Sequence, residues 1–512
     1  MIKEYIELRD KFCNELEPKS LKASIDCWNF YINSTPENMQ KYQNSQDEVY
    51  ALYKNEELYK KFKSMQVEDK HLAKQLRDLV KDFDEELNAG ELKKQLRDKE
   101  NEIAAKFNSY VPKIDGEEVS KAQLMKILET ESDVELRKKA YEARVLSGDV
   151  IADDLVEFVK MRNEFAKTKG YKNFFEYNLK ETYDVDADYL QKLLDDVYDN
   201  AYDMNQKLQA ENKKELAQEY GISEKDLRQY HYGLLLKNNP AKAVNEALKT
   251  KEQVVEIAKN TYKNMGYDVE SMPITLDLFP RKNKNTHGFC FDIDAGKDAR
   301  ILANLTNNTN SIDTLCHELG HCVYHIGINP EMPFFDKSAY PAMTEAVAML
   351  MGDLQQKEDV LKPVVSADVL EKFKANHKKS EAKFISRSML IINFEKQMYE
   401  NPEQDLKQLW HDLRLKYTGA NEDEPLNNAW ATIPHYLSHP AYYQNYFRAD
   451  LIKAQMYKTM RADLGNITEN KETANYLNDK LFKYGTSLEE SELIELFTGS
   501  QLSSDALCES LK

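Results

Sequence analysis

Hydrophobic positions recur at helical spacing over the first half of the chain. Between positions 190 and 201, an apolar stripe falls at i, i+3, i+4, i+7, i+8 and i+11, with Asp, Lys and Asn residues opposite it. Residues that break helices are scarce, because Gly90 is the only glycine before position 110 and no proline lies between Pro112 and Pro240. The pattern predicts helix after helix up to about residue 270.

The pattern changes between about 270 and 341, where five of the fourteen prolines fall. Short β-rich runs at 274–279, 287–293 and 300–305 are separated by turn formers such as 294–297. Helical periodicity then resumes and continues to the C-terminus. We therefore predict a mainly α protein with a small antiparallel sheet, and we expect the functional site where the helical pattern is interrupted.

The composition is acidic and rich enough in apolar residues for a large core. The 512 residues carry 70 Lys and Arg against 88 Asp and Glu, a formal charge of −18, and 41% are hydrophobic. This charge disfavours nucleic acid and anionic membranes as partners. Because no linker or compositional shift marks a boundary, residues 1–512 are predicted to form a single domain.

Six cysteines are too few and too scattered for a disulfide framework, and we predict that they are thiols. The segment 1–7 carries charges at helical spacing, whereas a secretory signal needs an apolar stretch, and no run of 18 apolar residues occurs. We expect a soluble cytoplasmic protein. Its oligomeric state is left open.

A metal-binding motif follows the last short strand, His317-Glu318-x-x-His321. On a helix, residues four apart lie on one face about 6 Å apart along the axis, so both imidazoles can reach one Zn²⁺ ion. Glu318 is rotated by about 100° from His317, where its carboxylate can accept the proton of an attacking water. Ser311 or Asp313 is expected to cap this helix. The alternative is a chance match over five residues.

A third ligand has two candidates. His325 continues the i+4 series, but it lies about 12 Å along the axis from His317 and cannot share one ion with both other histidines. Glu345 is the only charged residue of the apolar segment 341–352, and a carboxylate in such a segment needs a cation nearby. Alternatively, Glu345 faces solvent on an amphipathic helix. The residues alone leave both interpretations open.

The stretch that precedes the motif resembles a known family. The segments 287–292 (HGFCFD) and 296–301 (GKDARI), followed by the motif helix, are similar to the corresponding region of the angiotensin-converting-enzyme family of gluzincin zinc metallopeptidases. Similarity continues in the same order along nearly the whole chain, at 28–30, 162–166, 410–419 and 498–506.

The resemblance implies a fold and a set of metal ligands. The fold is a large helical two-lobed ellipsoid with a deep central cleft that admits oligopeptides and a small sheet next to the zinc helix. It would be one peptidase domain whose zinc-site core spans about 270–450. His317, His321 and Glu345 would hold one Zn²⁺ per chain, and Glu318 would act first as general base and then as general acid.

The resemblance also implies residues that bind the substrate and the oxyanion. A strand would pair with the substrate backbone, and its residues are His287, Gly288, Phe289 and Cys290. His435 and Tyr446 look like the family's His and Tyr that donate hydrogen bonds to the tetrahedral oxyanion. Their spacing of eleven is one longer than in angiotensin-converting enzyme, so His439 is a rival of His435.

Two activities follow from the resemblance. A peptidyl dipeptidase, which releases C-terminal dipeptides, is the first prediction. The family's Lys that grips the substrate's C-terminal carboxylate is replaced by Ile433, which leaves Tyr443 as a candidate partner for that carboxylate. The alternative is an endo-acting oligopeptidase of the thimet/oligoendopeptidase type, which the sequence WATIPH at 430–435 favours. A remote alternative is an inactive helical scaffold that binds peptides.

Overall fold

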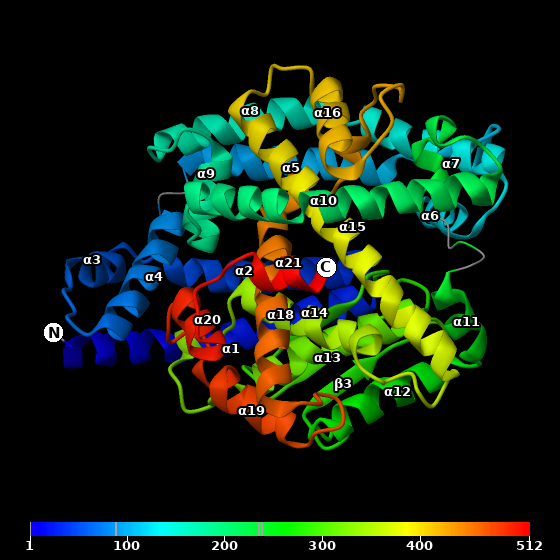
Figure 1. Ribbon diagram of the computed structural model, residues 1–512. Coiled ribbons are helices and arrows are strands. Elements are labelled where there is room, and N and C mark those ends of the chain that lie inside the picture. The colour runs from blue at the N-terminus through cyan, green and yellow to red at the C-terminus, as the bar shows by residue number, and fades with distance from the viewer. Residues whose placement is uncertain (1, 88–89, 234–235, 237–238, 512) are drawn as a thin grey trace. The chain divides into compact units, whose positions relative to one another are not determined.

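The computed structural model describes residues 2–87, 90–233, 236 and 239–511, and most of them are helical (Figure 1). The predicted mainly α fold with a small sheet is therefore confirmed. The chain divides into two compact units, of which the first comprises Met1–Gly90, Ala243–Lys374 and Ala449–Leu502. The second comprises Glu91–Lys242, Ala375–Arg448 and Ser503–Lys512. That residues 1–512 act as one peptidase domain stays a prediction.

The first unit contains the sheet that carries the predicted substrate strand, together with the motif helix. Its elements are α1 (Ile2–Ile32), α2 (Pro36–Tyr53), α3 (Glu56–Ser64), α4 (Lys70–Leu87), α12 (Lys251–Asn264), β3 (Ile274–Asp277), β4 (Phe289–Asp292), β5 (Ala299–Leu302), α13 (Thr309–Gly327), η3 (Phe334–Asp336), α14 (Pro341–Lys357), α19 (Glu472–Lys480), η5 (Phe482–Tyr484) and α20 (Glu490–Thr498).

The second unit is helical apart from one two-stranded hairpin. Its elements are β1 (Lys113–Ile114), β2 (Glu117–Glu118), α6 (Lys121–Thr130), α7 (Val134–Asp149), α8 (Ala152–Thr168), α9 (Phe174–Tyr183), α10 (Ala187–Tyr220), η1 (Glu224–Asp226), η2 (Gln229–His231), α16 (Leu406–Thr418), η4 (Ala429–Thr432), α17 (His435–Ser438) and α21 (Asp505–Leu511). Four of the five unit boundaries fall inside further helices, which are α5 (Gly90–Ser109), α11 (Pro240–Ala247), α15 (Ala367–Glu400) and α18 (Tyr443–Leu464).

Helix α10 shows how the sequence pattern becomes structure. The apolar stripe predicted between 190 and 201 is its buried face, including Leu190, Leu194 and Val197. The Asp186 side chain accepts a hydrogen bond from the N–H of Tyr189 at the start of the helix, which satisfies a backbone donor that has no intrahelical partner.

Among the described residues, no helix is long and apolar enough to cross a membrane.

The three-stranded sheet has the order β3-β5-β4, so β4 is an edge strand. Strands β4 and β5 form an antiparallel hairpin in which Cys290 pairs with Ile301. The sheet is mixed, because β3 runs parallel to β5 and pairs Leu276 with Ile301. The hairpin turn contains Gly296 at φ +80, where a Cβ atom would lie 2.6 Å from the carbonyl oxygen of His325. Glycine is needed here for both its φ and its size.

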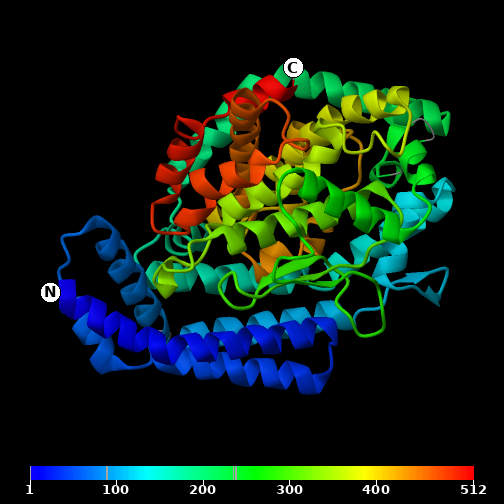
Figure 2. The same cartoon turned by 90° about the horizontal axis from the view of Figure 1, so that it is seen from below.

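One side of the sheet packs against α1 and the other against α13. Trp28 from α1 forms a buried cluster with Ile293 and Leu302, and its ring meets the Phe291 ring edge-on at 5.4 Å. Figure 2 shows α1, in dark blue, running beside the strands. Because β4 alternates its side chains, the residues on either side of Phe291 are directed to α13.

Helices α13 and α14 pack closely along their lengths. A Cβ atom on Gly320 would lie 2.8 Å from the Cα atom of Ala348, so a glycine is needed at the contact. The sequence prediction was wrong about the cap of α13. Asn308, not Ser311 or Asp313, is the N-cap, and its side chain accepts the N–H of Ser311. The helix begins at Thr309 because Asn308 can take the extended conformation that a cap requires.

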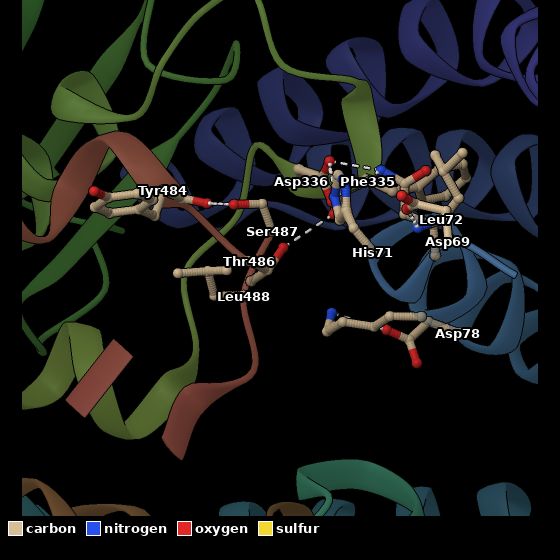
Figure 3. Close-up of polar contacts among 12 residues, drawn as sticks. Asp69, His71, Leu72, Asp78, Phe335, Asp336, Tyr484, Thr486, Ser487 and Leu488 are labelled. Atoms are coloured by element: carbon tan, nitrogen blue, oxygen red, sulfur yellow. Dashed lines mark hydrogen bonds and ion pairs between the residues drawn. The ribbon is translucent and has the colours of Figure 1, made fainter. Parts of the chain in front are cut away.

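A buried carboxylate ties the connection between α13 and α14 to the N-terminal helices (Figure 3). Asp336 is 1% exposed, and its Oδ2 atom lies 2.8 Å from His71 Nε2 and 2.6 Å from Gln75 Nε2 on α4. The backbone N–H of Thr486 donates to the carbonyl oxygen of Asp336. These bonds fix the segment that leads into α14, which carries Glu345.

Candidate metal centre

Three predicted ligands converge in the first unit. His317 and His321 lie one turn apart on α13, and their Nε2 atoms are 3.2 Å apart. The Glu345 Oε2 atom reaches them from α14, at 3.6 Å from His317 Nε2 and 3.9 Å from His321 Nε2. The structure thus brings together, from two helices, the three side chains that the sequence singled out as a metal site.

The spacing of these atoms fits a zinc ion. Ligand atoms at about 2.0–2.1 Å from a tetrahedral zinc lie about 3.3 Å from one another, close to the separations seen here. Burial lowers the pKa of His317 to about 4, and burial together with His317 lowers the pKa of His321 well below its usual value. Both imidazoles are therefore neutral near pH 7 and offer the lone pairs that a metal needs.

Glu345 does not face solvent. Its side chain is only 10% exposed, and it lies among apolar residues of α14 such as Ala346 and Val347. A buried carboxylate is costly unless a cation or hydrogen-bond donors balance it. The amphipathic-helix alternative therefore does not describe this residue, whereas the proximity of its oxygen to two imidazole nitrogens does.

Glu318 lies on the face of α13 that is turned toward β4. Its carboxylate accepts a hydrogen bond from the backbone N–H of Cys290, and a Cβ atom on Gly288 would lie 3.0 Å from Glu318 Oε1. Burial and then the charge of Glu345 raise the pKa of Glu318 to about 8, which is the range of a group that exchanges protons near neutral pH. A nearby dication would lower that pKa.

Sequence reasoning missed the groups behind the two histidines. The Nδ1 atom of His321 lies 2.7 Å from the hydroxyl of Thr344, the residue before Glu345. If Nε2 faced a bound zinc ion, Nδ1 would carry the proton and would donate it in a hydrogen bond to this hydroxyl. Asp353 favours the charged form of His317, and Lys453 Nζ lies 2.6 Å from Asp353 Oδ2. Of these groups, only Thr344 could have been found from the sequence, because it directly precedes Glu345.

His325 lies away from the other two histidines, as its position on the helix predicts. Its Nδ1 atom is 3.4 Å from Asp292 Oδ2, on the last residue of β4. It belongs to the contact between α13 and the edge strand. His325 therefore contributes to the packing of α13 against β4.

The predicted oxyanion residues gather in the second unit. His435 begins α17, and its ring centroid lies 4.8 Å from that of Tyr443 and 6.1 Å from that of Tyr446. His439 is exposed, and its Nδ1 atom lies 2.8 Å from the hydroxyl of its neighbour Ser438. The cluster therefore forms around His435.

The predicted substrate strand keeps only part of its length as a β-strand. Phe289 and Cys290 open β4, whereas His287 and Gly288 precede it. His287 is exposed, and its N–H donates to the Asn285 side chain. Because β5 occupies one edge of β4, the opposite edge is the one that an added strand would use.

Comparison with known proteins places this geometry in a family. The sequence model of peptidase family M3, whose members are zinc-dependent metallopeptidases, matches residues 127–512. Oligopeptidase PepF of Bacillus subtilis (strain 168) is 24% identical over 420 residues, which cover 74% of this chain. The chain spans 58% of the length of that relative. Zinc as the cofactor is thus confirmed, and both matches favour the oligopeptidase relatives over the angiotensin-converting-enzyme family.

Replacement of Thr344 by Val should weaken zinc binding about 10–100-fold, because the hydroxyl that accepts the His321 Nδ1 proton is lost while the shape is kept. Competition with a chromogenic chelator measures the affinity. Thr498→Val is a matched control, since that hydroxyl donates to the Ile494 carbonyl in α20. Unchanged zinc affinity in Thr344→Val would contradict the role given to this hydroxyl.

Proposed function

We propose, on the premise that this chain belongs to peptidase family M3, that it is a zinc-dependent oligopeptidase that cleaves internal bonds of short peptides. The observation that carries the proposal is the convergence of His317, His321 and Glu345, with Glu318 one residue along the helix. The activity named for the Bacillus relative, an oligopeptidase, supports oligopeptide substrates. An inactive scaffold would have no need of a buried carboxylate beside two neutral imidazoles.

His317, His321 and Glu345 would hold the zinc ion. When bound, the ion would supply Lewis-acid chemistry, which polarises the scissile carbonyl and acidifies the attacking water. Glu318 accepts the proton of that water and then passes it to the leaving amine. Thr344 keeps the His321 ring in the orientation in which Nε2 points to the ligand site.

The edge strand β4 would bind the substrate backbone. An extended peptide can add to its outer edge through main-chain hydrogen bonds, which recognise any sequence. The backbone N–H of Cys290 already bonds the Glu318 carboxylate, so a peptide on this edge would lie next to the general base. His287, Gly288 and Phe289 extend the same edge toward the N-terminus of the strand.

Tyr446 and His435 would donate hydrogen bonds to the oxyanion that forms on the scissile carbonyl. Support comes from their gathering in one cluster with Tyr443 and from the half-buried position of Tyr446, which leaves the ring partly open to solvent. His435 is preferred to His439 because its ring meets that of Tyr446, whereas the recorded ring contacts of His439 are with His435 and Tyr442.

The residue two positions before His435 favours endopeptidase activity over release of dipeptides. Ile433 is 6% exposed and contributes to the core, so no cation stands there to hold a C-terminal carboxylate. Tyr443 is a weaker partner for such a charge, since a phenol offers one neutral donor. The peptidyl-dipeptidase activity stays a prediction, to be separated from endopeptidase activity by experiment.

We also propose a cytoplasmic location, which the free thiols of the six cysteines fit.

Glu318→Gln should keep zinc and lose hydrolysis, with kcat lowered about 10²–10⁴-fold, because the amide cannot accept the proton of the attacking water. Zinc content and turnover of a quenched fluorescent peptide are measured on the same sample. Glu331→Gln makes the same chemical change at an exposed site and should turn over like the wild type. Full activity in Glu318→Gln would refute the assigned role.

Amidation of a peptide's C-terminus should leave kcat/KM nearly unchanged, since an endopeptidase makes no contact that requires a free carboxylate. Rates for the amidated and the free peptide are compared by mass spectrometry, which also locates the cleaved bond. Loss of cleavage on amidation, with a dipeptide as the sole small product from the free peptide, would establish the peptidyl dipeptidase instead.

Tyr446→Phe should lower kcat about 10²–10³-fold with little change in KM, because the hydroxyl acts mainly on the charge that develops in the transition state. Tyr442→Phe removes a neighbouring hydroxyl and is the control. His435→Ala should resemble Tyr446→Phe, whereas His439→Ala should resemble the wild type. The reverse order of the two histidine variants would assign the role to His439.

A further inference from the structure

Strand β4 and helix α13 meet in a regular series of contacts. Gly288 lies against Glu318, the sulfur atom of Cys290 against that of Cys322, and Asp292 against His325. Alternate residues of a strand are about 6.6 Å apart and residues one helical turn apart are about 5–6 Å apart, so the two elements stay in register.

The two cysteines in this series lie within reach of a covalent bond. The Sγ atoms of Cys290 and Cys322 are 3.1 Å apart, and both residues are thiols. A disulfide has an S–S length of about 2.0 Å, so closure requires the sulfur atoms to approach by about 1 Å. A movement of this size is within the range of a side-chain adjustment and a small shift of an edge strand.

A pocket lies beside one of the two cysteines. It has a volume of about 440 Å³, lies between α1, α2 and β4, and is lined by Cys290, Cys27, Tyr42 and Tyr50 among others. Cys322 is fully buried behind Cys290. Cys290 is only partly buried, so an oxidant would meet Cys290 first, and Cys322 would be the second thiol.

We propose that Cys290 and Cys322 form a reversible disulfide when the protein meets hydrogen peroxide, and that this bond switches off peptide hydrolysis. The sulfur of Cys290 attacks one peroxide oxygen, which gives a sulfenic acid and releases water. The sulfur of Cys322 then attacks the sulfenic sulfur, and a second water leaves. Two thiols are oxidised, one peroxide is reduced to two waters, and a dithiol reductant restores the thiols.

The effect on hydrolysis rests on the proposed function, because it acts through Glu318 and the substrate edge of β4. The N–H of Cys290 bonds the Glu318 carboxylate, and Glu318 and Cys322 lie one turn apart on α13. A disulfide that draws the strand toward the helix by about 1 Å displaces both the edge and the general base, and a misplacement of this size costs up to about 10²-fold in rate.

The reaction is expected to be slow near neutral pH. The hydrogen bond with Cys322 and burial raise the pKa of the Cys290 thiol, and the protonated thiol is a poor nucleophile. The pair therefore responds to sustained rather than brief exposure to peroxide. Cys27 lines the same pocket and is a natural internal control for access of the oxidant.

The test uses the zinc-loaded full chain exposed to hydrogen peroxide, followed by alkylation and peptide mapping. We expect a cross-link between Cys290 and Cys322 with loss of two hydrogens, and a fall in hydrolysis of about tenfold or more that dithiothreitol reverses. Zinc content is measured in parallel and should be unchanged. Cys27→Ser is the matched control and should still form the cross-link and lose activity.

Two variants keep the proposal falsifiable. Cys322→Ser and Cys322→Ala should lack the cross-link and keep their own activity in peroxide, and a melting curve checks that each is folded. Absence of the cross-link in wild type at a peroxide dose that oxidises Cys27, or a cross-link from Cys290 to Cys27, would overturn the proposal. A cross-link without loss of activity would overturn the switch. If the wild type hydrolyses no peptide, the proposed function fails while the mapping still decides on the disulfide.

Discussion

The close packing of α13 on α14 is the constraint on which the site depends. Gly320 has no side chain, so the backbone of α14 approaches at Ala348, and the same approach brings Glu345 beside His317 and His321. A methyl group at Gly320 would push the helices apart and separate the carboxylate from the imidazoles. The metal centre is therefore a consequence of how two helices pack, and the buried charge of Glu345 is tolerated because a dication can balance it.

Helix α13 uses a second face for the rest of the chemistry. The face toward β4 carries Glu318 and Cys322, and Gly288 and Cys290 of the strand region lie opposite them. The proposed general base and the edge proposed for the substrate are thus held by one contact between a helix and a strand. Any change in that contact, including the disulfide proposed above, acts on both together.

Many features of the fold and of the candidate site could be predicted from the sequence. The features that were missed have physical causes. Long helices followed from periodicity, and the motif gave the two histidines because i and i+4 share a helix face. The parallel pairing of β3 was beyond local patterns, since strand order depends on distant contacts. The same holds for Thr344 and Asp353, whose roles come from packing across helices, and for the 3.1 Å contact between Cys290 and Cys322, residues 32 positions apart. The family resemblance predicted a zinc peptidase. The comparisons with known proteins favour the oligopeptidase relatives over the angiotensin-converting-enzyme family.

X-ray absorption at the zinc K-edge of the reduced, zinc-loaded protein tests the central claim most directly, because it reports the ligands themselves. The account predicts one zinc per chain with only nitrogen and oxygen neighbours at about 2.0–2.1 Å and the outer-shell signal of two imidazoles. A sulfur shell at about 2.3 Å would assign the ion to cysteines such as Cys290 and Cys322, and a single imidazole or none would remove His317 and His321 as a pair. Either result would contradict the centre described here.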